Sequence, residues 1–367
     1  MGGEGFLFIP DYIGLFYGLI FELPEYIRNE PVEPEGFIGE FRKYGRYENT
    51  DLFIIVLLAC VWTFVRHIFT KYIFKPLTNH LQLTPVNAAK FPESAWRFTF
   101  YTFSWSFTAY VIFFCGYEVF YKPNIIFKGW TVGSLVPSEI YWLYAVQGSF
   151  YLHSMFATIF LDVWRSDSLV LCIHHVLTLI LITFSYTVRY HVLGSLVLLC
   201  HDFNDIFLEL AKCCVYSKPR KNGSKVEIYE TLGNICFGVF FVSWCVTRMY
   251  WYPFKVLLTI QPSVAKVYYS DHLPFGLEFN LMLWAIMLMD VYWFVFIVIL
   301  LVKILTGTMK EMEDIREDND GATAVGKPVT NGTSTEYSTN GIANGNGVKR
   351  RQVGGNGTMH SNHNHAE

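Results

Sequence analysis

Apolar residues along the chain gather into long runs separated by short polar segments. A transmembrane helix needs about 20 mostly apolar residues, at a rise of about 1.5 Å per residue. The runs predict transmembrane helices at residues 50–70, 97–120, 139–162, 168–186, 191–215, 230–258 and 276–305. The predicted fold class is therefore all-α: a polytopic membrane protein of about seven transmembrane helices.

The composition agrees with a membrane protein, since 52% of the 367 residues are hydrophobic and only 16% are charged. The apolar runs stop near residue 309, and the chain then becomes acidic in EMEDIREDND and rich in Gly, Asn, Ser and Thr. We predict three parts: an N-terminal lumenal segment at 1–48, a transmembrane domain at 49–309, and a disordered cytosolic tail at 310–367.

Lysine and arginine residues indicate which way the helices run. The loops after the first, third and fifth predicted spans carry more of them than the loops on the opposite side, and the positive-inside rule places such loops in the cytosol. Arg42, Lys43 and Arg46 before the first span point the other way, although glutamates accompany them. An odd number of spans then gives a lumenal N-terminus and a cytosolic C-terminus. No basic patch indicates a nucleic-acid partner.

Ionisable residues lie inside two of the apolar runs, in the stretch CIHHVLTLILITFSYTVRYHVLGSLVLLCHDFNDIFLELAK at 172–212. From the helical rise, His174 and His175 lie about 9–11 Å below the cytosolic edge of the membrane. Asp202 and Asp205, in the antiparallel fifth span, lie about 9–13 Å from the same edge of a core about 30 Å thick. The sequence therefore predicts a central polar pocket in the cytosolic half of the bilayer.

Two further residues, His153 in the third span and Asp290 in the seventh, fall in or near the same layer. Each carboxylate at this depth costs about 2.5–3.5 kcal/mol on insertion scales. A purely structural role would need several costly polar contacts where leucine would pack for less. We therefore interpret the layer as a functional site, although for His153 alone a hydrogen bond between helices explains the residue equally well.

Other charged residues have simpler expected roles. Glu209 lies on the same side of the fifth span as the two aspartates, and Lys212 follows it by one turn and can neutralise it. Arg248, near the lumenal end of the sixth span, is expected to extend its charged group to the membrane surface.

The residue types favour acyl transfer. A neutral imidazole serves as nucleophile or general base near physiological pH, and a neighbouring carboxylate fixes its tautomer. Adjacent histidines point about 100° apart on a helix, so one can face a reacting carbonyl while the other meets an aspartate. Two histidines and two aspartates are also adequate metal ligands. A membrane di-iron hydroxylase, however, needs many more histidines than the scattered ones here.

The stretch from YLHSMFATIFLDVWRSDS through the paired histidines to HDFND resembles the Lag1 motif of ceramide synthases. The surrounding residues, about 50 to 308, resemble the TLC domain of that family. Details such as SYTVRYH and MDVYWFVFIVILLVKILTG are most similar to the type-1 branch of the vertebrate ceramide synthases. Like that branch, the chain has no homeobox-like insert between its first two predicted spans.

The resemblance implies an enzyme of the endoplasmic-reticulum membrane that joins a fatty acyl-CoA to the amine of a sphingoid base, giving ceramide or dihydroceramide. The type-1 likeness implies stearoyl-CoA. No metal or cofactor is expected, and a homo- or heterodimer is left open. A non-catalytic TLC-type lipid-binding or transport protein is the alternative function.

The resemblance also assigns residues. His174 and His175 match the family's essential histidines, Asp202 and Asp205 match its essential aspartates, and Trp293 falls where the last helix lines the acyl cavity. His153 and Asp290 are candidates for substrate binding. Our mechanistic hypothesis is that His174 takes the acyl group and that His175, with Asp202 or Asp205, removes the proton from the attacking amine.

Overall fold

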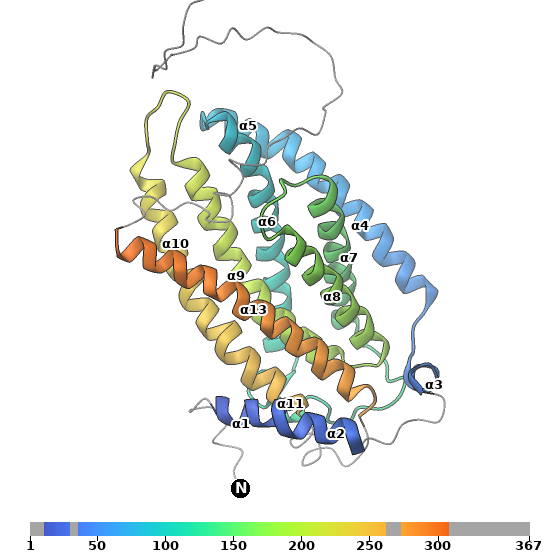
Figure 1. Cartoon of the computed structure of the whole chain (residues 1–367). Coiled ribbons are helices and arrows are strands. Elements are labelled where there is room, and N and C mark those ends of the chain that lie inside the picture. Colours follow the sequence, from blue (N-terminus) through green and yellow to red (C-terminus); the bar gives the residue numbers. More distant parts are fainter. Residues whose placement is uncertain (1–10, 30–35, 262–272, 308–367) are drawn as a thin grey trace, which may run out of the picture. The chain divides into compact units, whose positions relative to one another are not determined.

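The computed structural model describes residues 11–29, 36–261 and 273–307, and the elements named in these residues are all helices (Figure 1). They are α1 (Tyr12–Tyr17), η2 (Gly18–Glu22), α2 (Leu23–Asn29), α3 (Gly36–Tyr44), α4 (Asn49–Phe69), η3 (Thr70–Phe74), α5 (Lys75–His80), α6 (Pro85–Phe114), η4 (Glu118–Phe120), η5 (Pro123–Ile125), α7 (Ser138–Phe160), α8 (Ser168–Thr187), α9 (His191–Ser217), α10 (Glu227–Val246), η6 (Thr247–Leu257), α11 (Leu258–Ile260) and α13 (Gly276–Leu305).

The predicted all-α membrane fold is confirmed. Among the described residues, five helices are long and apolar enough to cross a membrane. They are Asn49–His80, Ser168–Thr187, His191–Ser217, Glu227–Ile260 and Gly276–Leu305. Each contains or overlaps one of the predicted apolar runs, because a long run of residues that water cannot solvate forms the helix that satisfies its own backbone in lipid.

The two other predicted spans, 97–120 and 139–162, correspond to α6 and α7. These helices have 30 and 23 residues, but they carry buried polar side chains such as Glu93, Ser104 and Gln147 that lower their apolar content. α6 also begins twelve residues earlier than predicted. Thr84 caps it by accepting a hydrogen bond from the Asn87 backbone N–H, and Pro85 occupies the first turn, where its missing N–H costs nothing.

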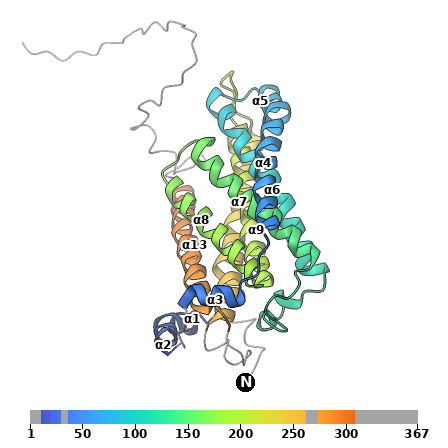
Figure 2. The same ribbon diagram turned by 90° about the vertical axis from the view of Figure 1, so that its right-hand side faces the viewer.

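α9 lies inside the bundle and contacts both α6 and α10 (Figures 1 and 2). α4 packs on α7, α7 packs on α8, and α13 crosses α8 and η6. α4 is outermost, with exposed apolar side chains including Phe53, Val56 and Phe64. α9 instead buries most of its polar residues, so this helix brings ionisable groups into the interior.

The sixth predicted span changes its helical form part of the way along. α10 continues at Thr247 into the eleven-residue π-helix η6, which contains Pro253. Proline removes a backbone donor and clashes with the carbonyl four residues earlier, and the wider π-helical turn accommodates this. The change in helical form begins at Thr247, directly before Arg248.

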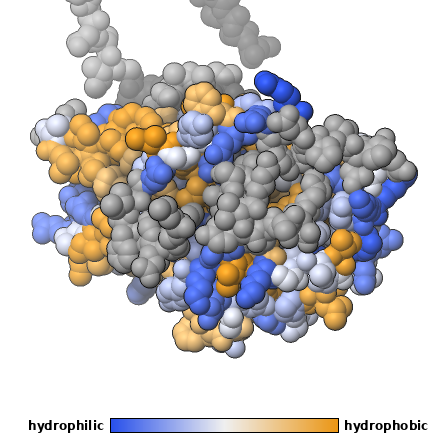
Figure 3. Space-filling view, turned by 90° about the horizontal axis from the view of Figure 1, so that it is seen from below, coloured by the Kyte–Doolittle hydropathy of each residue, from blue (hydrophilic) through white to orange (hydrophobic). Residues whose placement is uncertain are grey.

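The N-terminal helices lie against the end of the bundle near α11 and α13 (Figure 1). Leu15 is buried there, and the Gln261 side-chain amide donates to the Leu15 carbonyl at 2.8 Å. Ile13, Ile20 and Phe21 on the other side of this segment are exposed. Figure 3 shows this end of the molecule, where hydrophobic patches alternate with hydrophilic ones. The predicted tail at 310–367 lies outside the described residues, and the three-part division stays a prediction.

Candidate functional site

A pocket of about 190 Å³ opens among α6, α8, α9, α10 and α13. Its walls include four of the predicted site residues: His174 and His175 of α8, Asp205 of α9 and Trp293 of α13. We call it the main pocket. The structure thus brings the histidine pair and one of the two predicted aspartates to a shared cavity, from two antiparallel helices.

The imidazoles of His174 and His175 are turned apart from each other but have one aromatic neighbour in common. Their ring centroids are 5.8 Å apart with an angle of 57° between the ring planes, as expected for adjacent positions of a helix. Tyr151 of α7 contacts both rings, at 6.5 Å from His174 and 5.8 Å from His175. Both Nδ1 atoms are buried and find no hydrogen-bond partner within the described part of the chain. The expected direct contact between a histidine and an aspartate is therefore not formed.

The two motif aspartates have different surroundings. Asp202 is fully buried and accepts hydrogen bonds from Ser104 of α6 and Gln147 of α7, and it is not among the residues that line the main pocket. Asp205 is 21% exposed at its side chain and forms a wall of the pocket. One turn of helix therefore separates an aspartate that faces other helices from one that faces the cavity.

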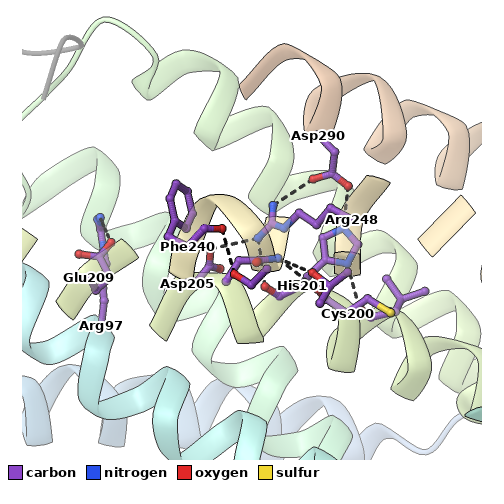
Figure 4. A network of polar contacts seen from close by, with 12 residues as sticks. Arg97, Cys200, His201, Asp205, Glu209, Phe240, Arg248 and Asp290 are labelled. Carbon is purple, nitrogen blue, oxygen red and sulfur yellow. Dashed lines mark hydrogen bonds and ion pairs between the residues drawn. The ribbon is translucent and has the colours of Figure 1, made fainter. Parts of the chain in front are cut away.

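Arg248 corrects a prediction, because it does not extend to the membrane surface. Its side chain is 5% exposed and lies in the interior, where it forms ion pairs with Asp205 and Asp290 at 3.0 Å each (Figure 4). The guanidinium also lies 4.1 Å from the ring centroid of Trp244, a favourable cation–π distance. A charged group at this depth is held where carboxylates can pair with it.

Asp290 and His153 lie outside the main pocket. Asp290 has no exposed surface and contacts His201 Nε2 as well as Arg248. His153 is 1% exposed, and its Nδ1 lies 2.9 Å from the hydroxyl of Thr63 on α4. The hydrogen bond between helices that the sequence allowed for His153 is thus present in the structure.

Trp293 contacts two other residues that line the main pocket, Asp167 and His174. Its indole N–H donates to the Asp167 carboxylate at 3.2 Å, directly before α8 begins. Its ring meets His174 edge to face, with centroids 5.4 Å apart. The last helix is thereby tied to the start of the histidine-bearing helix.

Charged residues surround one end of the main pocket. Arg97 and Lys212 line it, and both pair with Glu209, at 3.8 and 3.1 Å. The predicted neutralisation of Glu209 by Lys212 is confirmed. Figure 4 shows the Arg97–Glu209 pair well apart from the cluster around Arg248.

The connection between α7 and α8 is fixed to the same charged end. Asp162 lies two residues after the end of α7 and pairs with Arg97 at 2.6 Å and with Arg66 of α4. Burial raises the pKa of Asp162, but Arg97 and Arg66 outweigh it and hold this pKa below its usual value. The ionised carboxylate therefore links α4, α6 and this connection.

A second cavity, of about 40 Å³, adjoins His174 on the other side. Its lining is mostly apolar and includes Leu181, Val197, Phe279 and Leu283. We call it the apolar pocket. His174 lines both cavities; Asp, Glu, Lys and Arg side chains line the main pocket but not the apolar pocket.

Sequence reasoning missed Arg248 as a partner of Asp205, and it gave no role to Arg97 or His201. The sequence did contain a signal for the pairing of Arg248, because a charged residue within an apolar span is by default paired inside the bundle. The depth of a residue follows from counting, but its direction around the helix axis depends on neighbours that a single sequence does not specify.

The chain is similar in sequence to proteins of known family. Residues 90–299, more than half of the chain, match the family described as the TLC domain. Human ceramide synthase 1 is 44% identical over 73% of this chain and 75% of its own length. The chain belongs to the ceramide synthase family. Among its relatives in this family are mouse ceramide synthase 1, which is 40% identical over 76% of this chain and 79% of its own length, and the ceramide synthase hyl-2 of Caenorhabditis elegans, 30% identical over 77% and 87%.

Proposed function

We propose that this chain is a ceramide synthase, a sphingoid-base N-acyltransferase. It transfers the acyl group of a long-chain fatty acyl-CoA to the amine of sphinganine or sphingosine. The observation that carries the proposal is the main pocket, which His174, His175 and Asp205 all line, in a chain whose relatives are named ceramide synthases. Nucleophile, base and carboxylate are the groups that acyl transfer to an amine requires.

In the first step, a ring nitrogen of His174 attacks the thioester carbonyl carbon. A carbon–nitrogen bond forms, the carbon–sulfur bond breaks, and CoA leaves as the thiolate. His174 is our choice because it lines the main pocket, where charged side chains can meet the polar CoA, and also adjoins the apolar pocket. The edge of the Trp293 ring holds the imidazole in this position.

In the second step, the amine of the sphingoid base attacks the acyl carbon. The amide bond forms, the bond to His174 breaks, and the amine proton passes to His175 and finally to the CoA thiolate. Of the two aspartates, Asp205 is placed to act with His175 because it lines the same cavity, whereas Asp202 faces Ser104 and Gln147. His153 and Asp290 then support the surrounding helices.

We further propose stearoyl-CoA as the preferred donor, on the resemblance of the sequence to type-1 members of the family. The proposed location is the endoplasmic-reticulum membrane, with the pocket toward the cytosol, because CoA is too polar to cross the bilayer. The tail sequons at Asn331 and Asn356 should then stay unglycosylated in cells.

The test is ceramide formation in membranes that contain the expressed chain, supplied with sphinganine and with palmitoyl-, stearoyl- or lignoceroyl-CoA. Mass spectrometry of the lipids should show mainly the stearoyl product. His174→Ala and His175→Ala should each abolish it, while His80→Ala, at an exposed histidine outside the pocket, should not. A wild-type chain that binds these lipids without forming product would support the non-catalytic alternative.

A further inference from the structure

Arg248 is the centre of a buried polar cluster between α9, η6 and α13. One guanidinium nitrogen donates to Asp290 at 3.0 Å, and the other donates to Asp205 at 3.0 Å and to the His201 carbonyl at 3.1 Å. Figure 4 shows the guanidinium between the two carboxylates. A planar fork of donors can serve two carboxylates at once, which a lysine ammonium does poorly.

His201 completes the cluster. Its Nδ1 lies 2.8 Å from the Val197 carbonyl, and its Nε2 lies 3.0 Å from Asp290. His201 thus contacts one acceptor through each ring nitrogen, and Asp290 is held by both His201 and Arg248.

Only one carboxylate of this cluster reaches the main pocket. Asp205 is 21% exposed and lines the cavity with His174 and His175, whereas Asp290 has no exposed surface. Arg248 touches both, and it also lines the pocket. The buried part of the cluster therefore sets the position of the one group that a substrate can meet.

We propose that Arg248 is a positioning residue for the amine substrate: with His201 and Asp290 behind it, it holds the Asp205 carboxylate on the pocket wall, where this carboxylate receives the amino group of the sphingoid base. The inference rests on the function proposed above and deepens it. A long-chain base carries a cationic amine, and an anionic group beside the histidine pair attracts it and orients it toward the acyl carbon. Before the attack the ammonium loses one proton to His175, which releases it to water, because only the neutral amine has the lone pair that forms the amide bond.

The matched control lies on the same π-helix. Lys255 is also a buried cation of η6, but it donates to the Phe120 carbonyl at 2.7 Å and does not line the main pocket. Lys255→Met thus tests the general effect of removing a buried charge from this segment. It should leave both Michaelis constants within about twofold of wild type.

The experiment measures kcat and KM for sphinganine and for stearoyl-CoA in membranes carrying Arg248→Lys, which keeps the charge but loses the fork. We expect KM for sphinganine to rise about tenfold or more while KM for stearoyl-CoA changes less than about twofold. Arg248→Met combined with Asp205→Asn, which leaves the net charge of the cluster unchanged and so guards against misfolding, should be no worse than Asp205→Asn alone.

Three outcomes would overturn the inference while leaving the enzyme function intact. They are equal changes in KM for both substrates, multiplicative effects of the Arg248 and Asp205 substitutions, and unchanged kinetics of an Arg248→Lys protein that melts like wild type. A wild-type chain that makes no ceramide would overturn the proposed function and this inference together.

Discussion

His174 and Trp293 meet edge to face in the main pocket, with ring centroids 5.4 Å apart and ring planes at 85°. The same indole donates its N–H to Asp167, so α13 is fixed both to His174 and to the residue that precedes α8. Because aromatic pairs prefer this geometry, the contact limits the rotation of the imidazole. A side chain of the last helix thereby orients the histidine that we propose as the nucleophile.

Substitutions of Trp293 should distinguish the contribution of its ring contact with His174 from that of its hydrogen bond to Asp167. Trp293→Phe keeps a ring edge beside His174 and should retain ceramide synthesis within about fivefold of wild type. Trp293→Ala removes the wall and should lower kcat about tenfold or more, since misplaced reacting groups lose rate steeply. Tyr292→Ala, at the partly exposed neighbouring position, is the control. If the phenylalanine variant is as inactive as the alanine variant, the bond to Asp167 and not the ring contact is what matters.

The two motif aspartates should differ in kinetics. Asp205→Asn alters a pocket wall and should lower turnover about tenfold or more; it also leaves the buried Arg248 with Asp290 as its remaining charged partner and should lower the melting temperature. Asp202→Asn keeps an acceptor for Ser104 and Gln147 and should lower turnover less.

Asp202→Leu provides the stability test for the same site. It removes the acceptor of the Ser104 hydroxyl and one of the two acceptors of the Gln147 amide nitrogen, which still donates to Ser104, and it should destabilise the protein by about 1–3 kcal/mol. Parallel assays of ceramide formation and thermal melting in detergent measure both effects. Equal kinetic losses in Asp202→Asn and Asp205→Asn would show that burial does not separate their roles.

Much of the fold can be predicted from the sequence, because a helix that crosses lipid must be long and apolar. The apolar runs that became α4, α8, α9 and α13 were located nearly to the residue. The start of α6 was missed, because its first turns carry Glu93 and other polar residues that face neighbouring helices. Hydropathy measures the transfer of side chains into lipid, and it does not detect a helix whose polar side is covered by protein.

The site was predicted in part for a related reason. Depth along a helix placed His174, His175 and Asp205 at one level, and they do share a cavity. Rotation about the helix axis was not predictable, since it depends on tertiary partners. Asp202 therefore turned to α6 and α7, and Arg248 turned inward to two carboxylates.

The Asp162 carboxylate should make the free energy of unfolding depend on pH. Its side chain is 3% exposed and pairs with Arg66 and Arg97, and Asp162→Asn should cost about 3 kcal/mol at neutral pH. Its pKa is held below the usual 3.8, so the unfolded chain takes up this proton at higher pH than the folded one. The contribution is then complete above about pH 5 and disappears as pH falls through the folded-state pKa.

Melting curves of wild type and Asp162→Asn in detergent, measured across this range, should converge at the acid end. Glu118→Gln is the control, because Glu118 and Lys122 form a pair whose side chains are both 61% exposed. Such a surface pair contributes little. A difference between wild type and Asp162→Asn that stays constant down to the lowest pH would contradict the assignment of the ion pairs.

Gly194 lines the apolar pocket at a place where no larger residue fits. A Cβ there would lie 2.0 Å from the hydroxyl of Tyr144 and 3.1 Å from that of Ser185. The buried Tyr144 hydroxyl donates to the His191 carbonyl at 3.0 Å and cannot move without losing this bond. Gly194→Ala should therefore destabilise the protein by about 1–3 kcal/mol and reduce acyl transfer by narrowing the cavity beside His174.

A second substitution tests whether this hydroxyl is the cause. Tyr144→Phe removes it, so Gly194→Ala should cost less in that background, although the Cβ would still lie 3.1 Å from the ring carbon Cζ. Gly238→Ala is the matched control, because a Cβ on this exposed glycine of α10 meets nothing within 4 Å. Thermal melting and ceramide assays of the four proteins complete the double-mutant cycle. Strictly additive losses would mean that Gly194 is required by something other than its contact with Tyr144.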